Sequence, residues 1–183
     1  MGSHASFADR YPNDRFSRFT AKDVKQIEPR LSSGEAQNSA EYMNSILYND
    51  SIVSEIIKYY SQSSSIVIYF SDHAISRYDN PKAPTQAAHG VCESALQIPF
   101  MVYMSDQFAA ENPDVLLAVQ RARYKPFMTD LFTSSLMGLM GIESNYTIPR
   151  LQLWSLSYDA TRPRCVKGFG TEVTFSPKHP DQL

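Results

Sequence analysis

The amino-acid sequence predicts an α/β protein with a layered core. Three observations lead to this prediction: a long helical repeat of apolar residues over 38–60, a continuous β-branched and aromatic run over 65–70, and two further helical patterns after residue 113. The order helix, strand, loop, strand, helix, helix is typical of helices packed on a sheet. The chain of 183 residues is long enough for one domain with a real hydrophobic core.

The first predicted element is a helix from Asn38 to Tyr60, after a polar and irregular opening segment. Ser39 is the expected N-cap, and apolar residues then recur at helical spacing: Met43, Ile46, Leu47, Val53, Ile56, Ile57 and Tyr60. Asp50 falls on this apolar stripe. We therefore expect Asp50 to be a buried hydrogen-bonding anchor.

Two strands with a long loop between them follow the helix. The unbroken apolar character of residues 65–70 predicts a strand that is buried on both faces, as in a parallel sheet. Residues 74–97 contain prolines and a glycine with weak periodicity, which predicts a loop, and loops of this length are usually functional or disordered. The second strand is expected at 98–103, with Pro99 near its start, where a missing N–H does least harm.

The last third of the chain predicts two helices and an extended tail. Pro113 begins a helix that ends near Arg123, and a second helix runs over 127–140 until Gly141. Residues 151–175 are expected to be extended, with Trp154 and Phe169 available to pack on the sheet.

Composition excludes several classes of partner. The net charge is −2 and no basic run or stripe is present, so nucleic acid is not the expected partner. No apolar run approaches the length of a membrane span, and no secretory signal opens the chain. Cys92 and Cys165 permit a disulfide without implying one.

The most informative segment is the end of the first predicted strand, where Asp72 and His73 stand side by side. A carboxylate and an imidazole are ligands that zinc takes, and the ends of strands in open α/β sheets are where such folds place their sites. Because neighbouring side chains on a strand point to opposite faces, both can reach one ion only if the chain turns there. The alternative is an ordinary strand end with a capping aspartate and a hydrogen-bonded histidine.

Several blocks along the chain, taken together, resemble the phosphoethanolamine transferases of the alkaline phosphatase/sulfatase superfamily. Their order and spacing make the resemblance specific. The blocks are Gly2-Ser3-His4, Phe7, Arg10-Tyr11-Pro12 and Phe16; Tyr42, Asn44, Ile46, Leu47, Tyr48 and Asp50; Tyr69-Phe70-Ser71-Asp72-His73; His89-Gly90 and Ile98-Pro99-Phe100; Lys125-Pro126-Phe127 through Ile142; and Tyr158-Asp159 with Arg162-Pro163-Arg164.

The resemblance implies a fold and the part of the family's catalytic domain to which the chain corresponds. It implies the C-terminal portion of a three-layer α/β/α alkaline-phosphatase-like sheet, with residues 1–183 as a single partial domain. In the family, membrane spans, an acidic metal ligand and a nucleophilic threonine precede this region, and none of them can be found in the sequence. Ser3, Ser71 and Thr85 lack the strand-to-helix setting that a substitute nucleophile needs.

The resemblance also implies roles for four residues. Asp72 and His73 would be metal ligands, and His4 and His89 would be catalytic residues that contact the phosphate of the substrate. For His4 an alternative stays open, because Met-Gly-Ser-His is also typical of a cloning scar.

Other charged and small residues near these blocks have different expected roles. Arg10 and the pair Arg162 and Arg164 are expected to form structural ion pairs rather than to bind phosphate. Ala74 and Ile75 depart from the family, which has Gly-Glu after the histidine, and this departure bears on substrate and metal affinity.

The implied function is metal-dependent phosphoryl-group transfer as part of a longer enzyme. A divalent metal, zinc or manganese, would activate the threonine, and phosphoethanolamine would pass from a phospholipid head group to a lipid A or glycan acceptor through a phosphothreonine. The implied location is the periplasmic face of the bacterial inner membrane, with membrane association only through missing N-terminal segments. The alternatives are a catalytically inactive truncated fragment and a sulfate-ester hydrolase of the same superfamily.

Overall fold

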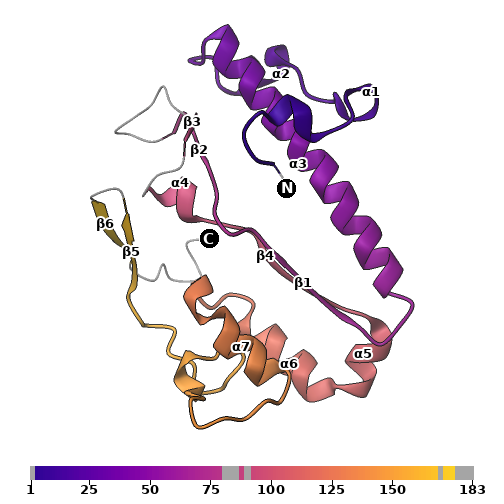
Figure 1. Ribbon diagram of the computed structural model, residues 1–183, viewed down its shortest axis with the longest axis vertical. Coiled ribbons are helices and arrows are strands. Elements are labelled where there is room, and N and C mark those ends of the chain that lie inside the picture. Colours follow the sequence, from indigo (N-terminus) through magenta and orange to yellow (C-terminus); the bar gives the residue numbers. More distant parts are fainter. Residues whose placement is uncertain (1–2, 80–86, 89–91, 169–170, 176–183) are drawn as a thin grey trace. The chain divides into compact units, whose positions relative to one another are not determined.

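The computed structural model describes residues 3–79, 87–88, 92–168 and 171–175 (Figure 1). The chain divides into two compact units. Unit 1 comprises residues 1–62 and 77–86, and unit 2 comprises residues 63–76 and 87–183. Within the described residues, no helix is both long and apolar enough to span a bilayer.

Unit 1 is built on one long helix, α3 (Ser33–Tyr60), with three short helices before it: η1 (Phe7–Arg10), α1 (Asn13–Phe16) and α2 (Ala21–Ile27). The predicted helix is confirmed, but its predicted N-cap is wrong. The N-cap is Ser32, whose hydroxyl accepts the Glu35 N–H while the Glu35 carboxylate accepts the Ser32 N–H. Such a reciprocal pair satisfies two helix-end N–H groups at once, which fixes the N-cap about two turns before Ser39.

The opening segment of unit 1 is helical and packed, not irregular. Asn44 on α3 is 2% exposed, and its side-chain oxygen accepts the Phe19 N–H at 2.8 Å while its nitrogen donates to the Phe19 carbonyl at 3.0 Å. The buried anchor is therefore Asn44, and the prediction for Asp50 is wrong because Asp50 is exposed. Edge-on ring contacts add to the packing: Phe7 with Tyr42 and Phe16 with Tyr48.

Unit 2 contains the two predicted strands. Strand β1 (Ile66–Phe70) pairs with β4 (Phe100–Met104), and the pairing is antiparallel, so the predicted parallel arrangement is wrong. All five side chains of β1 are half-buried. The pairs β2 (Ser76–Arg77) with β3 (Ala87–Ala88) and β5 (Arg164–Gly168) with β6 (Thr171–Phe175) complete the described sheets. The β5–β6 pair confirms the extended character of the tail over 164–168 and 171–175, whereas residues 151–163 form turns and the prediction is wrong there.

The helices of unit 2 agree with the prediction in part. The helix predicted from Pro113 is confirmed as α6, and the helix predicted over 127–140 is divided into η2 and α7. Two short helices were not expected: α4 lies in the segment predicted as a loop, and α5 follows the second predicted strand. The bounds are α4 (Glu93–Leu96), α5 (Asp106–Glu111), α6 (Pro113–Ala122), η2 (Thr129–Leu131), α7 (Phe132–Leu139) and η3 (Pro149–Leu151).

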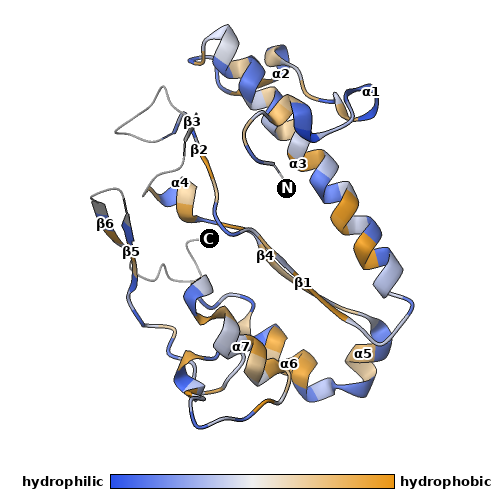
Figure 2. Ribbon diagram, in the orientation of Figure 1, coloured by the Kyte–Doolittle hydropathy of each residue, from blue (hydrophilic) through white to orange (hydrophobic). Residues whose placement is uncertain are grey.

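One face of the β1–β4 ladder forms the core of unit 2. Phe100 and Val102 pack against a buried cluster of Ala122, Leu153 and Trp154. The Phe70 ring lies 4.6 Å from that of Phe132 on α7, measured between centroids. Apolar residues accordingly follow the ladder and the α6 and α7 helices in Figure 2. The packing role of Trp154 is confirmed, whereas Phe169 lies outside the described residues.

Both cysteines carry free thiols. Cys92 is half-buried and Cys165 is exposed on β5. The disulfide that the sequence left open is therefore not formed in this structure.

Candidate metal centre

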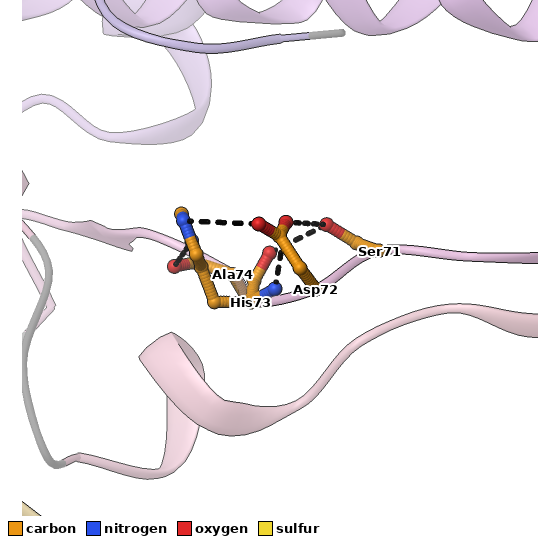
Figure 3. Close-up of polar contacts among 4 residues, drawn as sticks. All are labelled: Ser71, Asp72, His73 and Ala74. Atoms are coloured by element: carbon orange, nitrogen blue, oxygen red, sulfur yellow. Dashed lines mark hydrogen bonds and ion pairs between the residues drawn. The ribbon is translucent and has the colours of Figure 1, made fainter. Parts of the chain in front are cut away.

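The site begins where β1 ends at Phe70 and the chain turns over Ser71–Ala74 (Figure 3). The Ser71 hydroxyl donates to the His73 carbonyl at 2.6 Å, and it also lies 3.5 Å from Asp72 Oδ1. The His73 N–H donates to the same Asp72 oxygen at 3.0 Å. These contacts close a tight turn directly after the strand, as serine and aspartate side chains commonly do.

The turn brings the Asp72 and His73 side chains to face each other. Asp72 Oδ2 lies 3.8 Å from His73 Nε2 (Figure 3). The side chains are 87% and 43% exposed for Asp72 and His73, respectively, so an ion from solvent can reach both. Because the chain turns here, the two side chains do not point to opposite faces as neighbouring side chains do on an extended strand.

A backbone carbonyl orients the histidine ring. His73 Nδ1 lies 3.1 Å from the Ala74 carbonyl oxygen. A carbonyl only accepts, so we assign the ring proton to Nδ1, which leaves the lone pair of Nε2 directed toward Asp72. A histidine that ligates a metal is held in this way, with its second nitrogen donating to a carbonyl or carboxylate.

The Asp72 carboxyl is held in its ionised form. Slight burial raises its pKa, but hydrogen bonds, first of all the one from the His73 N–H and then that from the Ser71 hydroxyl, outweigh that effect, and the pKa of Asp72 is lowered. Metal ligands must be deprotonated to bind, so the lowered pKa favours the ligating form of this group.

The Asp72 carboxylate and the His73 imidazole suit one divalent cation, but they do not make up a complete set of ligands. Zinc bonds to nitrogen and oxygen are about 2.0–2.2 Å long, so two ligand atoms 3.8 Å apart are both within reach of one ion. Among the residues that the structure describes, no group of three His, Cys, Asp or Glu side chains could hold a metal. Asp72 and His73 are thus two donor groups that can approach one ion, whereas a zinc site takes at least three protein ligands.

Two further site residues, His4 and His89, were predicted from the sequence. His4 is an exposed residue just before η1 in unit 1, and His89 lies outside the described residues. Residue 74 does not adopt the left-handed backbone for which glycine is favoured, since the positive-φ residues other than glycine are Ser6 and Tyr78. Alanine is therefore accommodated there without strain.

Two supporting groups were missed in the sequence: the Ser71 hydroxyl and the Ala74 carbonyl. The only signal for them is the pair of small residues that flanks Asp-His, because a small side chain lets the backbone turn tightly. The ion pair predicted for Arg162 is confirmed, with Arg162 Nη2 2.9 Å from Asp130 Oδ2.

The comparisons with known sequences agree on one family. Residues 1–142 match the family described as Sulfatase. The chain is 30% identical over 117 residues to phosphoethanolamine transferase EptC of Escherichia coli O18:K1:H7, covering 62% of this chain and 20% of that protein. It is 25% identical over 154 residues to phosphoethanolamine transferase EptA of E. coli K12, covering 80% of this chain and 27% of that protein.

Two solved structures share the fold. The C-terminal periplasmic domain of E. coli EptC matches with a TM-score of 0.76 at 20% identity, over 96% of this chain and 50% of that one. The same domain in complex with Zn matches with a TM-score of 0.73 at 20% identity, over 100% of this chain and 50% of that one. These matches confirm the predicted alkaline-phosphatase-like α/β fold. The chain spans half of the solved domains and about a fifth of the first curated relatives.

Proposed function

We propose that this chain, which belongs to the sulfatase family, supplies the metal-ligating part of a phosphoethanolamine transferase. The observation that carries the proposal is the convergence of Asp72 Oδ2 and His73 Nε2 directly after a core strand. The similarity to proteins named phosphoethanolamine transferases supports the choice of reaction within the family.

Zinc is the metal that the donor set favours, because one imidazole nitrogen and one carboxylate oxygen are typical zinc ligands. The related domain solved in complex with Zn supports the same choice, and manganese is the second candidate. A cation held by Asp72 and His73 would lower the pKa of an attacking hydroxyl and offset charge on the transferred phosphoryl group.

The chain's own residues have separate tasks in this proposal. Asp72 and His73 bind the cation, Ser71 closes the turn that aligns them, and the Ala74 carbonyl keeps the proton on His73 Nδ1. His4 and His89 are proposed to contact the phosphate oxygens and to move a proton near neutral pH.

The proposed donor is a phospholipid head group and the proposed acceptor is lipid A or another glycan. A relative named Kdo(2)-lipid A phosphoethanolamine 7''-transferase, 29% identical over 112 residues, supports a lipid A acceptor. The solved periplasmic domains support a location at the periplasmic face of the inner membrane.

A chimera tests the proposal. Residues 1–142 of this chain replace the matching segment of E. coli EptC, and mass spectrometry of lipopolysaccharide measures phosphoethanolamine addition in cells that lack their own EptC. We expect the chimera to restore the addition, and we expect Asp72→Ala or His73→Ala to abolish it. A chimera that is folded, correctly localised and zinc-loaded, yet transfers nothing, would contradict the proposal and favour an inactive fragment.

A further inference from the structure

A surface loop of unit 2 carries a sequence motif that the proposed function does not use. The loop joins α7 to η3, and the motif within it is Asn145-Tyr146-Thr147. Asparagine followed two residues later by threonine, with any residue except proline between them, is the acceptor motif for N-linked glycosylation. The match to the Sulfatase family ends at residue 142, so the motif lies beyond the matched segment.

The end of α7 directs the chain into this loop. Gly141 has φ +67°, a left-handed conformation that glycine adopts readily, and the Ile142 N–H donates to the Met137 carbonyl at 2.9 Å. This Schellman-type ending stops the helix, so the residues that follow leave its axis. Pro149 then begins η3. The motif is therefore held in a short loop between two fixed ends.

Backbone and hydroxyl groups of Ser144 and Thr147 close the loop. The Thr147 N–H donates to the Ser144 carbonyl at 3.0 Å, which places Asn145 and Tyr146 at the centre of a β-turn. The Ser144 N–H donates to the Thr147 hydroxyl oxygen at 3.0 Å, and the Tyr146 N–H donates to the Ser144 hydroxyl oxygen at 3.2 Å. The turn is thus maintained without the side chain of Asn145.

The Asn145 side chain is available to an enzyme. Asn145 is exposed, and its carboxamide takes part in no hydrogen bond within the described residues. The neighbouring Tyr146 is 92% exposed, and Glu143, two residues before the asparagine, is exposed as well. Exposed loop tips are the parts of a fold that modifying enzymes reach most easily. No contact of Asn145 has to be broken before its amide can react.

A second copy of the motif, Asn49-Asp50-Ser51, has the opposite setting. It lies well inside α3, where the backbone N–H and carbonyl groups are engaged in the helix. Asn49 is half-buried, and the Ser51 hydroxyl donates to the Tyr48 carbonyl at 2.7 Å. A transferase could engage this copy only by unwinding the helix, so the structure distinguishes two motifs that the sequence presents as equivalent.

We propose that Asn145 is an acceptor for N-linked glycosylation and that Asn49 is not. The co-substrate is an oligosaccharide carried on a lipid pyrophosphate, and the enzyme is an oligosaccharyltransferase. Asn145 Nδ2 forms a bond to the anomeric carbon of the first sugar while the bond from that carbon to the pyrophosphate oxygen breaks. The lipid pyrophosphate leaves with the electron pair, and one amide proton passes to a carboxylate of the transferase.

The residues that flank Asn145 give the enzyme something to hold. An amide nitrogen shares its lone pair with the carbonyl and is a weak nucleophile, so the reaction depends on how the acceptor is positioned. The Thr147 hydroxyl can exchange its contact with Ser144 for one with the transferase, and Glu143 offers a carboxylate to a basic group. That the chain meets such an enzyme in the cell rests on the periplasmic location in the proposed function, whereas the accessibility of Asn145 does not.

Glycan transfer to the folded whole chain tests the inference. The purified chain is incubated with a purified bacterial oligosaccharyltransferase and its lipid-pyrophosphate-linked oligosaccharide, and intact mass spectrometry measures the mass added. We expect a gain of one glycan, assigned to Asn145 by peptide mapping. Asn145→Gln should abolish the gain, and the matched control Asn49→Gln should be modified as the wild type is.

Substitutions beside the asparagine test how the loop is recognised. Thr147→Ala should abolish transfer and Thr147→Ser should retain it, with circular dichroism showing that both variants are folded. Glu143→Gln should slow transfer about tenfold, because it removes one charge-assisted contact. An unchanged rate in Thr147→Ala and Glu143→Gln would contradict recognition of this motif.

A synthetic peptide of residues 141–149 is the positive control for the enzyme. A folded wild-type chain that stays unmodified while the peptide is glycosylated would overturn the inference, and so would equal modification of Asn49 and Asn145. The measured quantity is a mass and involves neither a metal at Asp72 and His73 nor phosphoethanolamine. Failure of the proposed transferase function therefore leaves this result unaffected, and the two failures can be told apart.

Discussion

Single side chains, rather than long elements, hold the opening of unit 1 in place. Asn44 satisfies both backbone groups of Phe19 from within α3, and its nitrogen also lies 3.4 Å from the Tyr11 hydroxyl. An amide has the oxygen and nitrogen needed to pair a peptide group on both sides, which a carboxylate such as Asp50 cannot do.

We predict that Asn44→Ala lowers the free energy of unfolding by about 2 kcal/mol, because it leaves a buried peptide group of Phe19 with no protein partner. Chemical denaturation followed by circular dichroism measures the change. Gln37→Ala is the control, since Gln37 is exposed and its side chain bonds to Glu41 on the same helix, and it should change stability by less than about 0.5 kcal/mol. Similar losses in both variants would contradict the anchoring role of Asn44.

The residues of the candidate site were predictable, but their arrangement was not. Asp72 and His73 stand out in sequence because they follow an apolar strand. Their convergence depends on hydrogen bonds from Ser71 and to Ala74 that no periodicity reveals.

At the scale of elements, the sequence predicts the existence of β1, β4, α3 and α6 but not their pairing or ends. An apolar run has no direction, and both faces of β1 carry large apolar side chains, so antiparallel pairing with β4 is indistinguishable from a parallel sheet. The start of α3 follows the capping-box spacing of Ser32 and Glu35, which the predicted start at Asn38 did not take into account.

The capping pair at the start of α3 gives a prediction for stability. Ser32→Ala removes the hydroxyl that accepts the Glu35 N–H and should lower the free energy of unfolding by about 1 kcal/mol. Ser33→Ala is the neighbouring control and should be nearly neutral, because alanine is a better helix former at the first helical position. Denaturant titration of both variants measures the difference, and an equal loss would argue against Ser32 as the cap.

The same pair gives a prediction for pH. The backbone N–H and then the hydroxyl of Ser32 lower the pKa of Glu35, so the ionised carboxylate favours the folded state. This contribution is complete above the pKa that Glu35 has in the unfolded chain and disappears as pH falls through the lower folded value. Glu35→Gln should therefore be less stable than the wild type at pH 7, and the gap should close on acidification. A gap that persists below pH 3 would contradict this linkage.

At the scale of the whole molecule, the chain corresponds to part of a domain of the sulfatase family. A two-stranded ladder is marginal alone, and here its core face is covered by the cluster of Ala122, Leu153 and Trp154. The chain spans half of the solved domains it resembles, and its described residues contain no group of three His, Cys, Asp or Glu side chains that could hold a metal. The fold class was predictable from the order of elements and the resemblance, whereas the division into two units was not, because no linker composition marks it.

The most direct test of the metal site is the ¹⁵N NMR spectrum of the four histidine rings during a zinc titration, with resonances assigned by substitution. We predict that without metal His73 carries its proton on Nδ1, and that zinc shifts its Nε2 resonance while the Nδ1–H persists. Asp72→Ala should weaken this zinc response at least tenfold, while Asp79→Ala, which removes a carboxylate elsewhere, should not change it. A His73 that is protonated on Nε2, or whose Nε2 resonance ignores zinc, would contradict the assignment of Asp72 and His73 as metal ligands.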